Sequence, residues 1–331
     1  MIRIALIGFG TVGRGFAKAL AENREIIEKK IGKFRISAIC DSKSSITGDF
    51  TIEEALRYKL EKGRLPESIG VEEIIEQGAF DVIVETTPTD VFSGEPGLGY
   101  IKKVLLSGRD VITSNKGPLV VAYHELIKLA EKHNARIGFE ATVGGAMPVI
   151  KMIRDGLAGN RVKRIRGILN GTTNYILSRM EKEKAPYPQI LSEAQELGIA
   201  EADPSYDVDG IDAGAKLVIL ANSVFGKDVR FEDVSIRGIT RITPEAFEIA
   251  VEKGYTIRLI AEADENGKLE VSPRLVKLTN PLAIYGTLNA VLIETDLAGE
   301  VFVIGRGAGE KETASALISD LVDFYGNGSF D

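Results

Sequence analysis

The chain has 331 residues, of which 44% are hydrophobic and 27% charged, and a formal net charge of −7. This length can form two domains with a large core, and the composition is ordinary for a soluble globular protein. The basic residues are scattered rather than gathered into a stripe, which argues against a nucleic-acid partner. No apolar run is long enough for a membrane span and no signal peptide precedes the first strand, so we expect no membrane partner.

Cysteine and histidine are scarce. Cys40 is the one cysteine, so an internal disulfide cannot form, and a cytoplasmic location is the default expectation. The two histidines, His124 and His133, fall on one predicted helix without a neighbouring cluster of cysteines or aspartates. A zinc site or a histidine-based catalytic site therefore has little support.

The chain opens with a nucleotide-binding pattern. Residues 2–7 (IRIALI) predict a buried strand, and a helical pattern follows that continues through the charged segment 22–33. Between them lies G-x-G-x-x-G, with glycines at Gly8, Gly10 and Gly13. The first glycine allows a tight turn, the second admits a pyrophosphate, and the third lets the helix pack closely on the strand. We therefore expect a dinucleotide with its phosphates at the helix N-terminus.

The type of dinucleotide stays open. A second strand, 34–40 (FRISAIC), leads into Asp41, about 30 residues after the glycines instead of the usual spacing of about 20. The long first helix explains the delay. A carboxylate at this place binds the ribose 2′-hydroxyl of NAD, whereas Lys43 or Lys59 could receive the 2′-phosphate of NADP. The sequence predicts NAD or NADP without choosing between them.

Strands and helices continue to alternate further along the chain. Residues 81–90 and 110–119 predict strands, and residues 97–107 predict a helix between them. Such alternation is typical of a right-handed, parallel α/β sheet, so we expect a Rossmann-type domain.

The carboxyl ends of these two strands contain polar residues. Ligands bind at this edge of parallel sheets. Thr87 lies at the end of one strand, and Ser114 and Lys116 lie at the end of the other. Lys116 is either an ordinary surface lysine in a loop or a functional group, and its position favours a functional role.

A small-residue turn follows a predicted helix (123–133) and a short strand near Ile137. Gly144 and Gly145 form this turn, just before a predicted helix over 148–155. A glycine pair lets backbone carbonyls converge, which can ligate a hard cation. The residues alone favour an ordinary tight turn.

A polar corner follows the next predicted strand, 162–169. Four uncharged hydrogen-bonding residues stand between this strand and a helix: Asn170, Thr172, Thr173 and Asn174. Asn and Thr commonly cap helices. Four such residues exceed what one cap requires, so binding of a small polar ligand is the alternative.

The most informative segment runs from Gly198 to Phe225. Its first part contains five acidic residues, Glu201, Asp203, Asp207, Asp209 and Asp212. An apolar run follows that predicts a helix ending at Gly226. The one charge in that run, Lys216, lies one turn after Asp212 on the same helix face. Lys216 either pairs with Asp212 while its stem extends to water, or is a buried ammonium that the protein uses.

The last part of the chain predicts strands and one helix. Short apolar runs between 256 and 306, separated by turn residues, predict mainly antiparallel strands. A last helix is expected over 310–325, and Gly307 and Gly309 would let it return to the nucleotide domain. The tail, 326–331, is expected to fray.

Five strings occur in one order along the chain: GFGTVG, TSNKGP, EATVGGAMP, GILNGTTNYIL and EADPSYDVDGIDAGAKLVIL. With these strings the chain resembles homoserine dehydrogenase over nearly its whole length. The resemblance implies NAD(P)-dependent interconversion of L-aspartate 4-semialdehyde and L-homoserine, in the biosynthesis of threonine, methionine and isoleucine. It also implies a homodimer, here expected in a short form, because the sequence stops at Asp331 without the C-terminal regulatory module of many relatives.

The resemblance implies an α/β fold, with a Rossmann-type nucleotide-binding domain plus an α+β catalytic and dimerisation domain. We expect the nucleotide domain over 1–135, with 306–331 packing back onto it. We expect the dimerisation region over 136–150 and 286–305, and the catalytic substrate domain over 151–285.

The resemblance also assigns roles to residues. Lys216 resembles the lysine that acts on the carbonyl oxygen, and Lys116 resembles a second lysine beside the nicotinamide. The candidate substrate-binding residues are Glu201, Asp212, Asn170 and Thr172. The two acids among them resemble residues that hold the amino-acid end. The candidate cofactor contacts that match family positions are Phe9, Gly10, Thr11, Val12, Gly13, Thr87, Lys116 and Gly309. The residue patterns described above add Gly8, Asp41, Lys43, Lys59 and Ser114 to the candidate cofactor contacts. A sodium ion is implied at Glu140, Val143, Gly145 and Met147.

Two rival functions can be compared with this hypothesis, and the position of Cys40 argues against the first. A semialdehyde dehydrogenase that forms a thioester needs a nucleophilic cysteine, and Cys40 lies instead at the end of the second strand, on the adenosine side. A non-catalytic NAD(P)-binding sensor would keep the glycine turn but need neither Lys116 nor Lys216. The dehydrogenase hypothesis requires both lysines to meet around one carbonyl oxygen, and which of them delivers the proton stays open.

Overall fold

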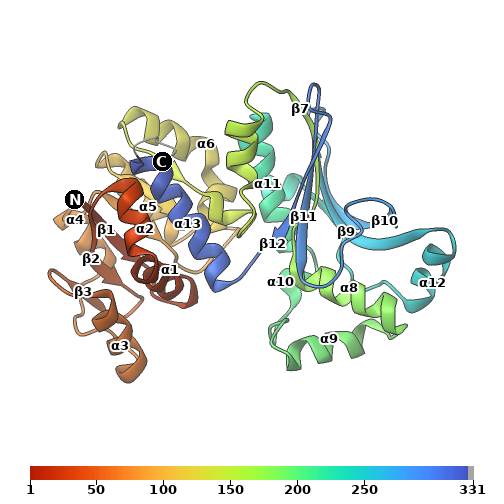
Figure 1. Cartoon of the computed structure of the whole chain (residues 1–331), viewed down its shortest axis with the longest axis horizontal. Coiled ribbons are helices and arrows are strands. Elements are labelled where there is room, and N and C mark those ends of the chain that lie inside the picture. The colour runs from red at the N-terminus through yellow and green to blue at the C-terminus, as the bar shows by residue number, and fades with distance from the viewer. Residues whose placement is uncertain (327–331) are drawn as a thin grey trace. The chain divides into compact units, whose positions relative to one another are not determined.

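A computed structural model describes residues 1–326, so the tail that was expected to fray lies outside the described residues from 327 onward. The chain forms two compact units, Met1–Ala146 with Gly309–Asp331, and Met147–Ala308 (Figure 1). Each unit contains a six-stranded sheet with helices, which confirms the predicted α/β class. None of the helices within residues 1–326 combines the length and apolarity that crossing a bilayer requires.

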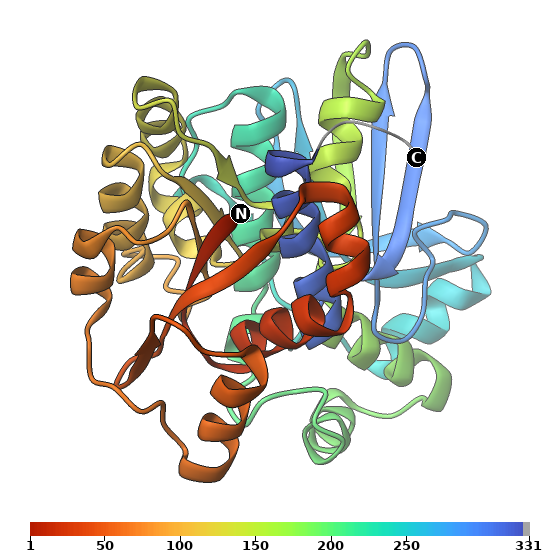
Figure 2. The ribbon, with the colours of Figure 1, turned by 60° about the vertical axis from the view of Figure 1, so that its left-hand side comes forward.

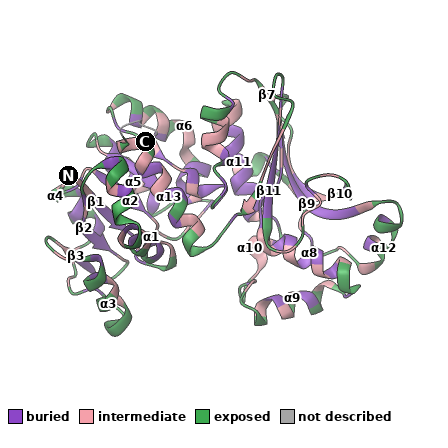
Figure 3. Cartoon of the chain, in the orientation of Figure 1, coloured by how far each residue is buried: buried purple, intermediate pink, exposed green. Residues whose placement is uncertain are grey.

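The sheet of the first unit has the strand order β3-β2-β1-β4-β5-β6, and only the pair β2–β3 is antiparallel. Its strands are β1 (Ile2–Ile7), β2 (Phe34–Cys40), β3 (Ser45–Thr47), β4 (Val82–Glu85), β5 (Asp110–Thr113) and β6 (Ile137–Gly138). Its helices are α1 (Thr11–Glu22), α2 (Arg24–Ile31), α3 (Ile52–Lys62), α4 (Val71–Gln77), α5 (Gly97–Leu106), α6 (Lys116–Lys132), a 3₁₀ turn (Glu140–Thr142) and α13 (Glu310–Tyr325). The whole of β4 and β5 is buried. Most residues of β1 and β2 are buried as well (purple in Figure 3). Continuous burial is typical of parallel strands between helices, and the predicted Rossmann-type sheet is confirmed.

Helix α13 belongs to the first unit, together with Met1–Ala146. The blue C-terminal helix lies against the red N-terminal helices α1 and α2 (Figure 2). Leu317 and Leu321 fill the same core cluster as Leu6. A Cβ on Gly15 of α1 would stand 2.2 Å from Cγ of Glu310, so this glycine permits the close approach of the two helices.

The single long helix predicted after the glycine turn was wrong. Two helices, α1 and α2, meet at Asn23, whose φ and ψ of −109° and 17° are not helical. Its side-chain Nδ2 donates to the carbonyl oxygen of Ala19 at 3.0 Å. Asparagine competes in this way for backbone groups and so interrupts a helix.

The predicted strands 81–90 and 110–119 were too long. β4 ends at Glu85 and β5 at Thr113, and α6 begins at Lys116 rather than at residue 123. The side chain of Asn115 caps α6 by accepting a hydrogen bond from the backbone N of Gly117 at 3.0 Å. Lys116 is therefore the first residue of a helix and not part of a loop.

The sheet of the second unit has the strand order β12-β11-β7-β9-β10-β8, antiparallel except between β10 and β8. Its strands are β7 (Val162–Ile168), β8 (Ser235–Ile236), β9 (Tyr255–Asp264), β10 (Leu269–Lys277), β11 (Leu288–Thr295) and β12 (Glu300–Arg306). Its helices are α7 (Val149–Lys151), a π-helical turn (Met152–Gly156), α8 (Gly171–Glu183), α9 (Tyr187–Glu196), α10 (Ser205–Val208), α11 (Ile211–Phe225), a 3₁₀ turn (Phe231–Asp233) and α12 (Pro244–Glu252). The predicted antiparallel strands between 256 and 306 are thus confirmed.

Helix α11 packs on β9 and β10 and is buried from Asp212 to Asn222. It ends as predicted at Gly226, which has a left-handed φ of +61°. The helix predicted over 148–155 is regular only in α7, because a π-helical turn follows in which the backbone N of Leu157 donates to the carbonyl oxygen of Met152 at 2.9 Å.

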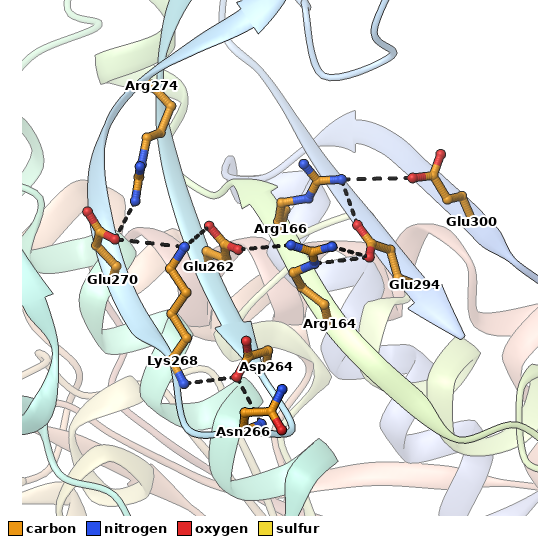
Figure 4. Close-up of polar contacts among 10 residues, drawn as sticks. All are labelled: Arg164, Arg166, Glu262, Asp264, Asn266, Lys268, Glu270, Arg274, Glu294 and Glu300. Atoms are coloured by element: carbon orange, nitrogen blue, oxygen red, sulfur yellow. Dashed lines mark hydrogen bonds and ion pairs between the residues drawn. The ribbon is translucent and has the colours of Figure 1, made fainter. Parts of the chain in front are cut away.

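One part of the second sheet holds a network of ion pairs across its strands (Figure 4). Glu294 of β11 accepts from Arg164 of β7 at 2.8 Å and from Arg166 at 2.6 Å. Arg164 also lies 3.5 Å from Glu262 of β9, which pairs with Lys268 at 2.7 Å. Arg164 and Glu294 stand directly opposite each other, so the network stabilises the pairing of β7 with β11.

We predict that Glu294→Ala lowers the free energy of unfolding by about 1 kcal/mol, because Arg164 and Arg166 lose their common partner. The loss stays small because both guanidinium groups are partly exposed and water screens their charges. Urea unfolding at low salt measures the change. The matched control is Glu300→Ala, whose exposed carboxylate lies 3.8 Å from Arg166 and should change stability little. Equal effects of the two substitutions would contradict the prediction.

Candidate active site

The glycine turn lies where β1 has β2 on one side and β4 on the other. Gly8 has a φ of +94°, and a Cβ there would stand 2.5 Å from the carbonyl oxygen of Thr86. A Cβ on Gly13 would stand 2.0 Å from the carbonyl oxygen of Gly8, so α1 packs tightly on the turn. Gly10 caps α1, and a Cβ there would meet no atom of the described chain within 4 Å. Gly10 therefore leaves room at the helix N-terminus, where a pyrophosphate fits.

The other predicted cofactor residues near the turn differ in exposure. Thr11 is exposed and Val12 is half-buried at the start of α1. The side chain of Phe9 is 1% exposed and lies in the core, so only its backbone is placed to meet a cofactor. Gly309 caps α13 with a φ of +136° and is exposed.

Asp41 lies in one polar cluster with both lysines that were proposed for the 2′-phosphate. Lys59 Nζ donates to its Oδ2 at 2.6 Å. The backbone N of Lys43 donates to Oδ1 at 2.9 Å, and Ser44 donates to the same oxygen through its backbone N and Oγ. Burial works to raise the pKa of Asp41, but these hydrogen bonds outweigh it and hold the pKa below its ordinary value. The side chain of Lys43 is exposed, whereas Lys59 is half-buried against the carboxylate.

The ends of β4 and β5 lie side by side and bring Thr87, Ser114 and Lys116 to one edge of the sheet. They also hold an acid that the sequence analysis did not single out. Glu85 is fully buried, and it accepts hydrogen bonds from the backbone N of Thr87 and from the hydroxyl of Thr113, both at 2.7 Å. Burial raises the pKa of Glu85. The sequence signal for Glu85 was a single acid at the end of an apolar run. It was missed because the predicted strand, 81–90, placed Glu85 in the middle of the strand and not at its end.

In the second unit, the ammonium of Lys216 is buried at the start of α11. Lys216 is 7% exposed and Asp212 is 6% exposed. Lys216 Nζ donates to Asp212 Oδ2 and to the carbonyl oxygen of Leu169, both at 2.7 Å. The predicted i,i+4 pair is therefore present, but the interpretation in which the lysine extends to water was wrong. The end of β7 provides a second acceptor inside the protein.

Asn170 both caps a helix and holds two acids. Its Oδ1 accepts from the backbone N of Thr173 at 2.9 Å, which caps α8. Its Nδ2 donates to Asp207 Oδ1 at 2.6 Å and to Asp212 Oδ2 at 3.0 Å. The cap and the polar cluster are thus two functions of one side chain.

Asp207 is a further member of this cluster. Burial and then the charge of Asp212 raise the pKa of Asp207, and the hydrogen bond from Asn170 partly opposes that rise. The hydroxyl of Thr172 donates to the carbonyl oxygen of Ile199 at 3.1 Å. Glu201, by contrast, is exposed, and its backbone oxygen accepts from Gln195 at 3.0 Å. The structure therefore groups Asn170, Asp212 and Lys216 closely but leaves the Glu201 side chain on the surface.

The predicted sodium residues lie around the glycine pair. Glu140 and Val143 are buried, and Gly145 has a φ of +56°. The backbone N of Glu140 donates to Asp320 Oδ2 at 3.0 Å. Met147 is the first residue of the second unit, so the four residues span the boundary of the units in the sequence. No cluster of three His, Cys, Asp or Glu side chains suited to a metal occurs in the described part of the chain.

The two lysines fall in different units, Lys116 in the first and Lys216 in the second. Their meeting around one oxygen stays a prediction. What the geometry provides is a dinucleotide turn in one unit and, in the other, a buried ammonium beside carboxylates. This combination defines the class of the protein as an NAD(P)-dependent oxidoreductase.

Comparison with known proteins agrees with that class. The family model for homoserine dehydrogenase matches residues 148–322, and the model for the NAD-binding domain of homoserine dehydrogenase matches residues 8–140. The chain belongs to the homoserine dehydrogenase family.

Individual relatives cover nearly the whole chain. Homoserine dehydrogenase of Methanocaldococcus jannaschii is 45% identical over 97% of this chain and 98% of that protein. A crystal structure of a putative homoserine dehydrogenase from Archaeoglobus fulgidus is 55% identical, with a TM-score of 0.95, over 99% of this chain and 100% of that chain. A hyperthermophilic archaeal homoserine dehydrogenase in complex with NADPH is 33% identical, with a TM-score of 0.85 and 97% of both chains covered.

We predict that Cys40 is unreactive in the folded chain. Burial, followed by the charge of Asp41, raises the pKa of Cys40 to about 11. Only about one thiol in a thousand is then ionised near pH 8, and the thiolate is the reactive form. Labelling by a thiol-exchange reagent should be at least about 100-fold slower in the folded chain than in guanidinium chloride. Rapid labelling of the folded chain would reopen the thioester mechanism.

Proposed function

We propose that this chain catalyses the NAD(P)-dependent interconversion of L-homoserine and L-aspartate 4-semialdehyde, a step towards threonine, methionine and isoleucine. The observation that supports it most is the fixed ammonium of Lys216, held by Asp212 Oδ2 and the carbonyl oxygen of Leu169. An ammonium group has three N–H donors. Two of them are engaged within residues 1–326, so the third can be directed at a substrate oxygen.

That donor matches the charge that the reaction creates. When bound, NAD(P) supplies the acceptor or donor of the hydride. Reduction of the aldehyde places negative charge on the carbonyl oxygen, and a preorganised donor to such an oxygen contributes about 3–4 kcal/mol. Proton transfer from a positioned group adds about 10²–10⁴-fold in rate. We assign the donor role to Lys216, with Lys116 as the second lysine on the nicotinamide side.

The remaining polar residues of the second unit suit the amino-acid end of the substrate. Asp212 and Asn170 lie in the Lys216 cluster, and Thr172 is the second residue of α8, beside Asp207. The carboxylate of Glu201 is exposed, so it can pair with the ammonium group of the substrate, as carboxylates commonly do. The substrate-binding set therefore remains Glu201, Asp212, Asn170 and Thr172.

The cofactor residues are proposed as follows. The turn Gly8–Gly13 receives the pyrophosphate, and the cluster of Asp41, Lys43 and Lys59 meets the adenosine ribose. Thr87, Ser114 and Lys116 lie at the ends of β4 and β5, in the half of the sheet that receives the second mononucleotide. Gly309 is proposed as a contact because α13 packs beside α1.

The assembly is also proposed by analogy with the family. We infer a homodimer in the cytoplasm, with a dimerisation region of 136–150 and 286–305, a nucleotide domain of 1–135 with 306–331, and a catalytic domain of 151–285. A structural sodium ion is proposed at Glu140, Val143, Gly145 and Met147.

The test of function is reduction of NAD⁺ and NADP⁺ with L-homoserine at alkaline pH. Turnover that depends on homoserine is expected with at least one of the cofactors. A chain that binds NAD(P)H but shows no turnover with either cofactor would be a sensor, and the proposed function would be rejected.

Lys216→Ala is expected to lower kcat by at least about 10²-fold while the affinity for NAD(P)H changes little, because the donor to the developing oxyanion is lost. Lys216→Met, which keeps the side-chain volume, should behave in the same way. The control is Lys227→Ala, since Lys227 donates to a backbone oxygen of Glu265 outside the cluster. Near-normal turnover in both Lys216 variants, with unchanged thermal unfolding, would exclude Lys216 as the donor.

Lys59→Ala is expected to weaken NADP⁺ binding about tenfold more than NAD⁺ binding. The substitution removes a cation and leaves the Asp41 carboxylate with neutral donors alone, so that its charge repels a 2′-phosphate. Calorimetric titration with both nucleotides measures the ratio, and Lys43→Ala, whose side chain is exposed, is the comparison. If Lys43→Ala shifts the ratio and Lys59→Ala does not, the 2′-phosphate site belongs to Lys43.

A further inference from the structure

We propose that Glu85 is a positioning residue that holds the loops after β4 and β5 in the shape that receives the nicotinamide. It acts through Thr87 and through the N-terminus of α6, where Lys116 stands. The inference depends on the proposed function only in that the bound dinucleotide is NAD(P).

Four uncharged donors converge on the buried carboxylate. The backbone N of Thr87 donates to Oε1 at 2.7 Å, and the hydroxyl of Thr87 makes a short hydrogen bond to the same oxygen. Asn115 Nδ2 lies 3.5 Å from Oε1, and the hydroxyl of Thr113 donates to Oε2 at 2.7 Å. An ionised carboxylate only accepts, so it satisfies all four donors at once. Glu85 thereby fixes the direction of both loops.

The same contacts continue into helix α6. The hydroxyl oxygen of Thr113 accepts from the backbone N of Asn115 at 2.9 Å. Asn115 Nδ2 lies 3.3 Å from the carbonyl oxygen of Pro88, and its Oδ1 caps α6 at Gly117. A displaced carboxylate would therefore move the helix cap and with it Lys116, which directly follows Asn115.

Close packing leaves the cluster little freedom. A Cβ on Gly97 of α5 would stand 2.6 Å from Asn115 Nδ2 and 3.3 Å from the carboxylate carbon of Glu85. A Cβ on Gly117 would stand 2.3 Å from the carbonyl oxygen of Asp90, so the loop before α5 also contacts the start of α6. A carboxylate in so dense a place is unfavourable unless its hydrogen bonds compensate. If this position only had to fill the core beside β4, an apolar side chain would do so without the cost of burying a carboxylate. We therefore attribute the role of Glu85 to its hydrogen bonds.

The position in the sheet assigns this cluster to the nicotinamide. A sheet with the order β3-β2-β1-β4-β5-β6 consists of two mononucleotide-binding halves that meet between β1 and β4. Asp41 follows β2 in the first half, which receives the adenosine. Glu85 and Thr113 end β4 and β5 in the second half. The loops that Glu85 holds therefore face the other end of the dinucleotide.

The test compares ligands with and without nicotinamide. We expect Glu85→Ala to weaken binding of NADH or NADPH about tenfold while binding of ADP-ribose, or of its 2′-phosphate form, changes less than about twofold. Glu85→Gln should keep most of the affinity, because its amide oxygen replaces Oε1 and its amide nitrogen can donate to the Thr113 hydroxyl. Thr113→Val, which cuts the link to Asn115, should show the same selective loss if Glu85→Ala does not fold.

The matched control is Asp110→Ala at the opposite end of β5. Asp110 is also buried, and it accepts hydrogen bonds from Arg136 at 2.5 Å and from the hydroxyl of Tyr325 at 2.7 Å. Its substitution should lower thermal stability but should not change the ratio of the affinities for NAD(P)H and ADP-ribose. Equal losses of NAD(P)H and ADP-ribose affinity in the Glu85 or Thr113 variants would overturn the proposal, as would no loss in either. The comparison uses binding alone, so it stands even if L-homoserine is not turned over and the proposed function fails.

Discussion

The buried ammonium of Lys216 is the interaction on which the second unit depends. Removing a charge from water is unfavourable by several kcal/mol unless partners in good geometry compensate. Here the partners come from separate elements, Asp212 from α11 itself and the carbonyl oxygen of Leu169 from the end of β7. The position of α11 along the sheet is therefore set by a polar contact as well as by its apolar surface.

Asn170 extends this constraint to a third element. It caps α8 with its oxygen and binds Asp207 and Asp212 with its nitrogen. Because one side chain serves both purposes, the start of α8 cannot shift without disturbing the acids beside Lys216. In the first unit, Glu85 has a comparable place, since its carboxylate links the ends of two strands and the cap of α6. Both clusters fix loops and helix ends by polar contacts at the ends of strands.

Much of this architecture could be predicted because it leaves a local pattern. The glycine turn, the buried strands, the apolar run of α11 and the return of α13 all follow from spacing and composition over short windows. The break at Asn23 and the start of α6 could not be predicted in this way. Ala122 has non-helical angles (φ −142°, ψ 32°), so the first turns of α6 are out of phase with the rest and show no single periodicity.

The candidate site was predictable in its residue types but not in its contacts. The sequence places Lys216 one turn after Asp212, yet the carbonyl oxygen of Leu169 that keeps the lysine from water lies far away in the chain. Glu85 shows the same difficulty, because its buried carboxylate needs donors from Thr113 and Asn115, which only the folded sheet brings to it. Hydrogen bonds between distant residues have no signature in a single sequence.

The membership of α13 in the first unit has a consequence for biosynthesis. A chain leaves the ribosome from its N-terminus, so the first 146 residues emerge long before Leu317 and Leu321, which complete their core. Until then, α1 and the strand beneath it expose apolar surface to solvent, and contacts between such distant segments form slowly. The entire second unit is a long insertion within the first. A nascent chain truncated inside that insertion would therefore be prone to aggregation, even though every strand of its nucleotide sheet had already been made.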